Sequence, residues 1–251
     1  MSVLVANAGF LWVSLLSSSI THKNAHLIHG VLVFVVILVL SFLYKASLKA
    51  VDDEVIPSEG VTVKNILQTI TESVLTLIRS IIPHHAEAYV PLVCTIFIYV
   101  FTANMVGVIP GFAAPTGNFS SNLAIGVAVF VYYNYVGIKT AGFTHYMAHF
   151  FGPSLGPGLG MVIMRVCVLA PLMFGLEIFS HCVRPVTLAL RLFVNINADH
   201  LVLGVFSGLV PLVVPVIFMA FGIFVAFMQA FVFALLSVIY IGMATQTQEH
   251  H

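Results

Sequence analysis

The sequence predicts an all-α membrane protein of about six helices, and three observations support this fold class. First, 60% of the 251 residues are hydrophobic and only 7% are charged, whereas a soluble domain is about 25% charged. Second, the mean hydropathy of the chain is +1.10. Third, several apolar runs approach the roughly 20 residues that a helix needs to cross a bilayer.

Charge and cysteine content exclude other classes. The formal net charge is zero and there is no basic patch, which argues against a nucleic-acid partner. The three cysteines lie inside apolar runs and form no CxxC pair, so neither a disulfide framework nor a cysteine zinc site is indicated. The N-terminus lacks the basic segment of a signal peptide.

Residues 1–60 are expected to form an N-terminal segment with one transmembrane helix, over residues 27–49. That run is apolar and long enough to span, and Lys45 and Lys49 mark its end. Because acidic residues follow at once, the two lysines say little about orientation. Residues 9–17 are too short to span, so a buried or interfacial helix is expected there.

Residues 61–251 are expected to form the second unit, which begins with an amphipathic helix over residues 61–82. Apolar side chains recur there at three- and four-residue spacing, with charged side chains on the other faces. Such a helix lies on a membrane surface or against a partner. A transmembrane hairpin is expected over residues 89–142, because two apolar runs flank the Gly- and Pro-rich residues 107–118.

The last part of this unit, residues 161–246, is expected to form a long tilted helix hairpin. Its two apolar runs, residues 161–200 and 203–246, would each give a helix about 60 Å long, roughly twice the hydrocarbon thickness. No polar turn divides either run, and prolines bend a helix without reversing it. We therefore favour two long, bent helices over four ordinary spans.

A polar stripe is expected along the first of these helices. Its charged members are spaced by seven residues, which drift only about 20° per step around a helix; they are Glu177, Arg184 and Arg191. The hydrogen-bonding side chains on the same side are Ser180, Thr187 and Asn195. Such uncharged groups often only join helices. An arginine at mid-membrane, by contrast, costs roughly 2.5–3.5 kcal/mol and marks an ion pathway or a counter-ion site.

Arg191 has no suitable carboxylate nearby on its own chain. Glu177 lies about 21 Å away along a helix, and Asp199 lies about 12 Å away. Residues 203–246 contain no acidic residue. Arg191 is therefore expected to face water, a carboxylate of another chain, or both.

Two further groups of polar residues leave alternatives open. Gln229, Ser237 and Tyr240 share a rough face of the final run, where they are either packing partners or members of a polar pathway. His145 and His149 are four residues apart and, together with His200, could bind a metal.

The run RPVTLALRLFVNINADHL, residues 184–201, resembles the signature of subunit a of F-type ATP synthases, called subunit 6 in mitochondria. Residues 102–111 and 115–124 resemble the middle hairpin of that family, and residues 229–241 resemble its last helix. The resemblance covers roughly residues 60–247, with the four motifs in the family's order.

The resemblance implies a stator subunit that provides two aqueous proton half-channels, without a nucleotide site of its own. Arg191 matches the essential arginine that faces the carboxylates of the c-ring. One half-channel is matched by Glu177, Ser180, Arg184 and Thr187, and the other by Asn195, His200 and Gln229. The further candidate pathway residues are Asp199, Ser237 and Tyr240.

The resemblance also implies partners and a location. The partners are the c-ring, the peripheral stalk, other membrane-sector subunits and the lipid bilayer, and protons are the transported ion, with no cofactor beyond the possible metal. His200 is the residue type of mitochondrial members, which favours the mitochondrial inner membrane, with a bacterial plasma membrane or thylakoid as alternatives. Members with a histidine at the position of His200 are expected to carry an acid at the position of Gly222. Asp199 is one candidate to replace this missing acid.

Other classes explain the sequence less well. A secondary transporter would show matched internal repeats, and none is apparent. A haem- or quinone-binding subunit would carry paired histidines in separate spans, and a purely structural subunit would leave Arg191 unexplained.

Overall fold

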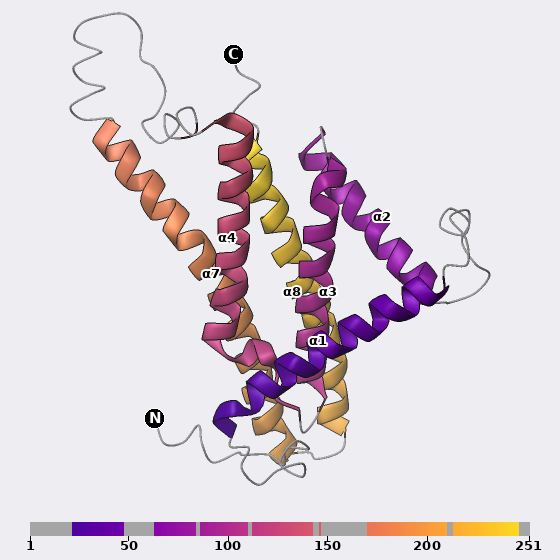
Figure 1. Ribbon diagram of the computed structural model, residues 1–251. Coiled ribbons are helices and arrows are strands. Elements are labelled where there is room, and N and C mark those ends of the chain that lie inside the picture. The colour runs from indigo at the N-terminus through magenta and orange to yellow at the C-terminus, as the bar shows by residue number, and fades with distance from the viewer. Residues whose placement is uncertain are drawn as a thin grey trace, which may run out of the picture.

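The computed structural model describes residues 22–47, 63–83, 86–109, 112–142, 146, 170–209 and 213–245. Within these ranges all regular structure is helical, and five helices are long and apolar enough to cross a membrane. The expectation of an all-α membrane protein is therefore confirmed (Figure 1). Residues 9–17, where a short helix was expected, lie outside the described residues.

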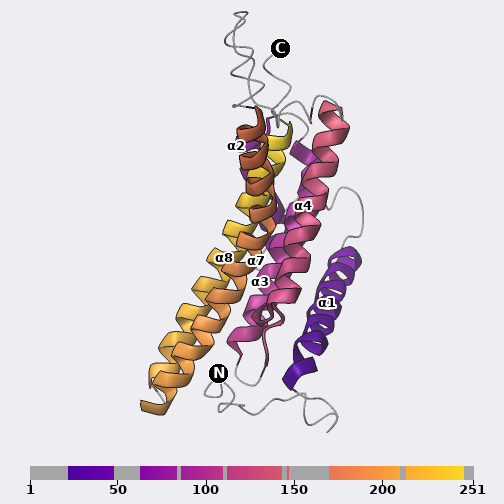
Figure 2. The same ribbon diagram turned by 90° about the vertical axis from the view of Figure 1, so that its left-hand side faces the viewer.

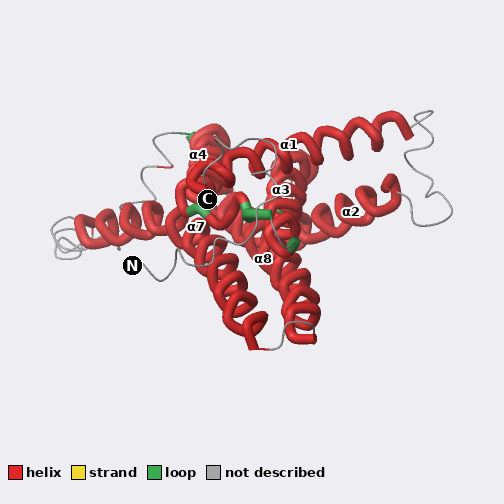
Figure 3. The backbone as a smooth tube through the Cα atoms, turned by 90° about the horizontal axis from the view of Figure 1, so that it is seen from below, coloured by secondary structure: helices red, strands yellow, loops and turns green. Residues whose placement is uncertain are grey.

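The first two helices lie at the edge of the bundle (Figure 3). α1 (His22–Ser47) contains the expected span, and most of its surface is exposed except at His29 and Val33. α2 (Val63–Ile81) is the expected amphipathic helix, and it buries Val74 and Ile78 in the core. Glu72 and Arg79 of its polar face are exposed, as the spacing of its apolar residues predicts, whereas Lys64 is buried.

The expected hairpin consists of α3 (Val90–Val108) and α4 (Phe119–Ala141). Two 3-10 turns precede these helices, η4 (Ala86–Tyr89) and η5 (Pro115–Gly117). The Asn118 side chain caps α4 by accepting a hydrogen bond of 3.0 Å from the Ser120 amide, which satisfies one of the free N–H groups of the first turn. Gly142, at φ 79°, ends α4 in a conformation that favours glycine.

α7 (Ala170–Leu209) and α8 (Val213–Thr245) are the two long helices. Their 40 and 33 residues correspond to lengths of about 60 and 50 Å. Figure 2 shows them running side by side at an incline. The expected break near residue 200 is wrong: residues 201–209 are apolar and lack a proline, so α7 continues to Leu209.

The core lies where α3, α4, α7 and α8 meet. α3 packs mainly against α8, and α4 packs mainly against α7. Fully buried side chains from all four helices fill this region, among them Val100, Tyr133, Leu192, Phe233 and Ile241. Because Leu192 is anchored in this core, the orientation of α7 around its own axis is fixed.

Candidate functional site

Arg191 lies on the outer face of α7. Its neighbours Leu188, Ala189 and Leu192 are buried, whereas Arg191 itself is exposed and stands beside the exposed Leu190 and Val194. Among the residues that the structure describes, no carboxylate lies within ion-pair distance of Arg191. That Arg191 faces water or a carboxylate of another chain stays a prediction.

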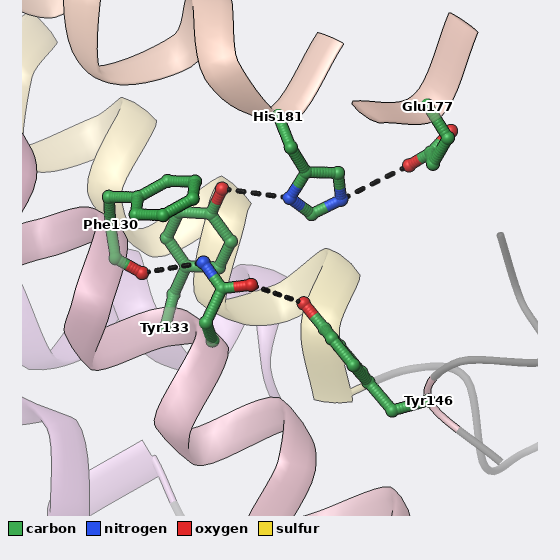
Figure 4. A network of polar contacts seen from close by, with 6 residues as sticks. Phe130, Tyr133, Tyr146, Glu177 and His181 are labelled. Atoms are coloured by element: carbon green, nitrogen blue, oxygen red, sulfur yellow. Dashed lines mark hydrogen bonds and ion pairs between the residues drawn. The ribbon is translucent and has the colours of Figure 1, made fainter. Parts of the chain in front are cut away.

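A polar cluster lies near the N-terminal end of α7 (Figure 4). Glu177 Oε1 is 3.2 Å from His181 Nε2, and His181 Nδ1 is 3.1 Å from the Tyr133 hydroxyl of α4. His181 and Tyr133 are buried, and Glu177 is partly exposed. The cluster therefore connects a carboxylate at the surface of the chain with the interior between α4 and α7.

Arg184 points into this cluster rather than along the outer face with Arg191. Its guanidinium carbon lies 5.2 Å from the ring centre of Tyr240 and 6.0 Å from that of Tyr133, within the range of a cation–π contact. The polar stripe expected from seven-residue spacing therefore divides, because the aromatic rings of α4 and α8 hold Arg184 inward.

Tyr146 extends the cluster beyond the end of α4. Its hydroxyl donates a hydrogen bond of 2.8 Å to Asn134 Oδ1, and Asn134 Nδ2 donates one of 2.7 Å to the Phe130 carbonyl. Burial, followed by the nearby Tyr133, raises the pKa of Tyr146 to about 12. The phenol is therefore neutral at physiological pH and remains a donor.

Three of the expected pathway residues carry hydroxyl groups that lie outside the polar cluster described above. Ser180 and Thr187 are exposed, and the Thr187 hydroxyl donates to the Arg184 carbonyl at 2.9 Å. Ser237 is fully buried and donates to the Phe233 carbonyl at 2.8 Å. The bonds of Thr187 and Ser237 stay within their own helices, so neither hydroxyl links α7 to α8.

A second polar contact joins the two long helices one turn beyond Arg191. Asn195 Nδ2 donates a hydrogen bond of 2.7 Å to Gln229 Oε1. Gln229 is buried, and its Nε2 has no hydrogen-bond partner among the described residues. A buried amide without a partner is costly, so this donor marks a place that favours a water molecule or another acceptor.

A cleft opens further along the same interface. It is lined in part by Asp199, His200, Gly107 and Gly222. The volume open to the centre of a water molecule is about 30 Å³, above the roughly 10–15 Å³ that one water molecule needs by this measure. Gly222 is buried opposite α3, where a Cβ would meet Val108 Cγ2 at 3.3 Å. The glycine that stands where an acid was expected thus lies in the same cleft as Asp199 and His200.

A buried hydrogen-bonded group holds the turn between α3 and α4. The Thr116 hydroxyl donates to Asn104 Oδ1 at 2.8 Å, and Asn122 Nδ2 donates to the Thr116 carbonyl at 2.7 Å. Asn104 Nδ2 and Asn122 Oδ1 have no hydrogen-bond partner in the described part of the chain. This group fixes the turn beside Gly107, which lines the cleft.

His181 and Tyr133 were not predicted as site residues. His181 follows Glu177 by four residues, which places the two side chains together on a helix, so this spacing was an available signal. The metal alternative lies largely outside the described residues, because these include neither His145 nor His149. No group of metal-binding side chains occurs among the residues that are described.

The fold and these clusters define a class of protein: an all-helical, multi-pass membrane protein with two polar clusters along its long helices and an arginine that has no ion-pair partner among the described residues. The family described as "ATP synthase A chain" matches residues 27–242. The chain therefore belongs to the ATP synthase A chain family, as the resemblance of its motifs predicted.

Individual relatives agree with this assignment. A protein named ATP synthase subunit a from Bdellovibrio bacteriovorus is 36% identical over 235 residues, which cover 94% of this chain and 97% of the relative. The proteins of the same name from Trichlorobacter lovleyi and Campylobacter jejuni are 40% identical over 209 residues and 37% identical over 244 residues. These cover 83% and 96% of this chain, and 82% and 98% of the relatives. All three organisms are bacteria, which fits the bacterial alternative rather than the mitochondrial inner membrane.

Proposed function

We propose that this chain is the stator subunit that couples proton flow to rotation of a c-ring in the membrane sector of an ATP synthase. The observation that carries the proposal is the position of Arg191, which is exposed on α7 and unpaired among the described residues. A guanidinium stays charged at any physiological pH. It therefore needs water or a carboxylate from outside the described residues, and in this proposal a ring carboxylate supplies one.

Two polar clusters flank Arg191 and correspond to the two aqueous half-channels. Toward the N-terminal end of α7 the cluster contains Glu177, with Ser180, Arg184, Thr187 and Tyr240 nearby. Toward its C-terminal end lie the Asn195–Gln229 pair and the cleft of Asp199 and His200. Ser237 contributes packing within α8 in this proposal, because its hydroxyl is bonded inside its own helix.

The coupling follows from the cost of burying charge. A ring carboxyl can rotate through lipid when it is protonated, but not when it is ionised. The positive charge of Arg191 favours the ionised carboxylate, so the carboxyl releases its proton as it approaches. Each proton that crosses a potential of 100 mV supplies about 2.3 kcal/mol. The mechanism uses protons as cargo and requires no resident cofactor.

Asp199 takes the place of the acid that is absent at Gly222 in this proposal. The two positions face the same cleft from α7 and α8, so a carboxylate on either helix reaches the same water. His200, whose residue type titrates near neutral pH, shares the cleft. The expected location is the bacterial plasma membrane, because the relatives described above are bacterial.

The test is Arg191→Ala in the intact ATP synthase, with Lys139→Ala as the control for loss of an exposed charge. We expect Arg191→Ala to abolish ATP-driven proton pumping in membrane vesicles, while the complex assembles normally on a native gel. Lys139→Ala should pump at the wild-type rate. Coupled pumping by Arg191→Ala at close to the wild-type rate would refute the proposal. Metal analysis of the purified complex tests the remaining metal alternative.

A further inference from the structure

The contact between Glu177, His181 and Tyr133 assigns a role to a histidine outside the expected pathway. We propose that His181 is a positioning residue, which contacts one carboxylate oxygen of Glu177 and aims the group so that its other oxygen exchanges protons with water. This inference rests on the proposed function, because it concerns the half-channel that contains Glu177.

The two polar contacts of the His181 ring indicate which ring nitrogen carries the proton. An ionised carboxylate can only accept, so the 3.2 Å contact requires a proton on His181 Nε2. In a neutral ring Nδ1 then accepts, and the Tyr133 hydroxyl at 3.1 Å is the donor. The partner of one ring nitrogen thus fixes the proton on the other, and Tyr133 orients the ring toward Glu177.

This arrangement leaves the second carboxylate oxygen available. His181 contacts Oε1 of Glu177, and the carboxyl side chain is 29% exposed. A proton can therefore bind at Oε2 and leave again while the contact between Nε2 and Oε1 stays intact. One proton arrives from water and one returns to water, so the transfer balances without any change in the protonation of His181.

The surroundings of His181 keep the ring in place. On α7 it lies between Glu177 and Arg184, and α4 contributes Tyr133, whose ring centre is 5.9 Å from that of His181. From α8, Tyr240 packs 5.9 Å from Tyr133 and 5.2 Å from the Arg184 guanidinium carbon. Tyr133 contacts the histidine directly, and Tyr240 and Arg184 pack in turn against Tyr133. A buried side chain held in this way loses little further freedom when it orients a carboxylate.

The experiment compares variants of the intact ATP synthase by ATP-driven and passive proton flux in vesicles. His181→Leu removes both polar contacts, to Glu177 and to Tyr133, at similar volume, and we expect flux to fall about as far as in Glu177→Gln. His181→Gln retains a donor and an acceptor but cannot ionise, and we expect it to restore most of the flux. Tyr133→Phe removes only the group that orients the ring and should have an intermediate effect. Cys182→Ala, at the exposed neighbouring position, is the control.

The double variant separates positioning from packing. If His181 acts only through Glu177, then His181→Leu added to Glu177→Gln lowers flux by less than twofold beyond Glu177→Gln alone. Multiplied losses in the double variant would mean independent packing damage and would overturn the proposal. Wild-type flux in His181→Leu would also overturn the proposal. Flux in His181→Gln as low as in His181→Leu would overturn it too, because it would indicate that His181 itself carries protons. These outcomes leave the proposed function standing as long as Arg191→Ala and Glu177→Gln remain impaired.

Discussion

Replacing Gly126 by alanine tests whether close contact between α4 and α7 holds Arg191 in position. A Cβ at residue 126 would lie 2.7 Å from the Pro185 carbonyl oxygen and 3.4 Å from its carbonyl carbon and Cα. All three are backbone atoms, so no side chain can rotate away. To regain ordinary contact distance, the two helices must separate by about 0.7 Å. Arg191 stands six residues further along α7, so the displacement reaches it.

The loss of thermal stability in Gly126→Ala is measured against Gly175→Ala as a matched control. Overpacking of this kind costs about 1–3 kcal/mol. Alanine also gains roughly 1 kcal/mol of helix propensity over glycine, and Gly175→Ala on α7 has the same gain with nothing within 4 Å of the new Cβ. The difference between the two variants is thus the overpacking cost. At about 2–4 °C per kcal/mol for a chain of this size, it corresponds to a difference of several degrees in thermal stability.

The assay heats purified ATP synthase and measures the fraction of this chain that stays in the complex on a native gel. Gly126→Ala should dissociate several degrees below Gly175→Ala, and its ATP-driven proton pumping should fall at a temperature where both complexes are intact. Equal midpoints for the two variants would show that α4 and α7 are not in close contact at Pro185, and would refute the reasoning.

Three further contacts between helices give predictions for proton flux or for stability. Gly222→Leu should fill the cleft beside Asp199 and slow proton flux, whereas Gly222→Ala, which needs only a small shift of one side chain, should be close to wild type; equal flux in both would remove the cleft from the pathway. In a double-mutant cycle with Asn195→Leu, Gln229→Leu and the double variant, we expect a coupling energy of about 0.6–2 kcal/mol in thermal stability. Purely additive losses would contradict the hydrogen bond between these two side chains. Thr116→Val leaves a second buried amide atom of Asn104 unpaired and should destabilise the complex by about 1–3 kcal/mol, with an unchanged midpoint as the contrary result.

Much of this fold could be predicted from the sequence, because it depends on local patterns. Apolar runs longer than a bilayer requires predicted α7 and α8, and three- and four-residue spacing predicted α2. The end of α7 was predicted less well. Residues 201–209 contain Gly204 and Gly208 but no proline, and the choice between continuing and turning there depends on how α7 packs against α8.

The positions of the acidic residues along the chain also predicted that Arg191 has no carboxylate nearby. That prediction requires only the distances between residues along a helix. The Tyr133–His181 contact joins residues 48 positions apart, so it exists only once α4 has docked on α7. In the same way, Gly222 and Asp199 were recognised as separate positions, and only the packing of α7 against α8 places them in one cleft. Local periodicity shows which residues share a helix face, but not what that face meets.

The placement of Arg191 explains, under the proposed function, why protons would not leak between the two half-channels. The polar side chains nearest to it along α7 are Thr187 and Asn195, each four residues away, or about 6 Å along the axis. A proton that crossed directly from one side to the other would pass within about that distance of a guanidinium that cannot lose its charge. At 6 Å and an effective dielectric constant of about 20, the repulsion is roughly 2.8 kcal/mol, or about 100-fold in rate. A ring carboxylate at this position removes that barrier, because its negative charge offsets the guanidinium. Proton transfer is therefore favoured when the ring supplies the carboxylate, and rotation follows because each carboxyl must be protonated before it can leave.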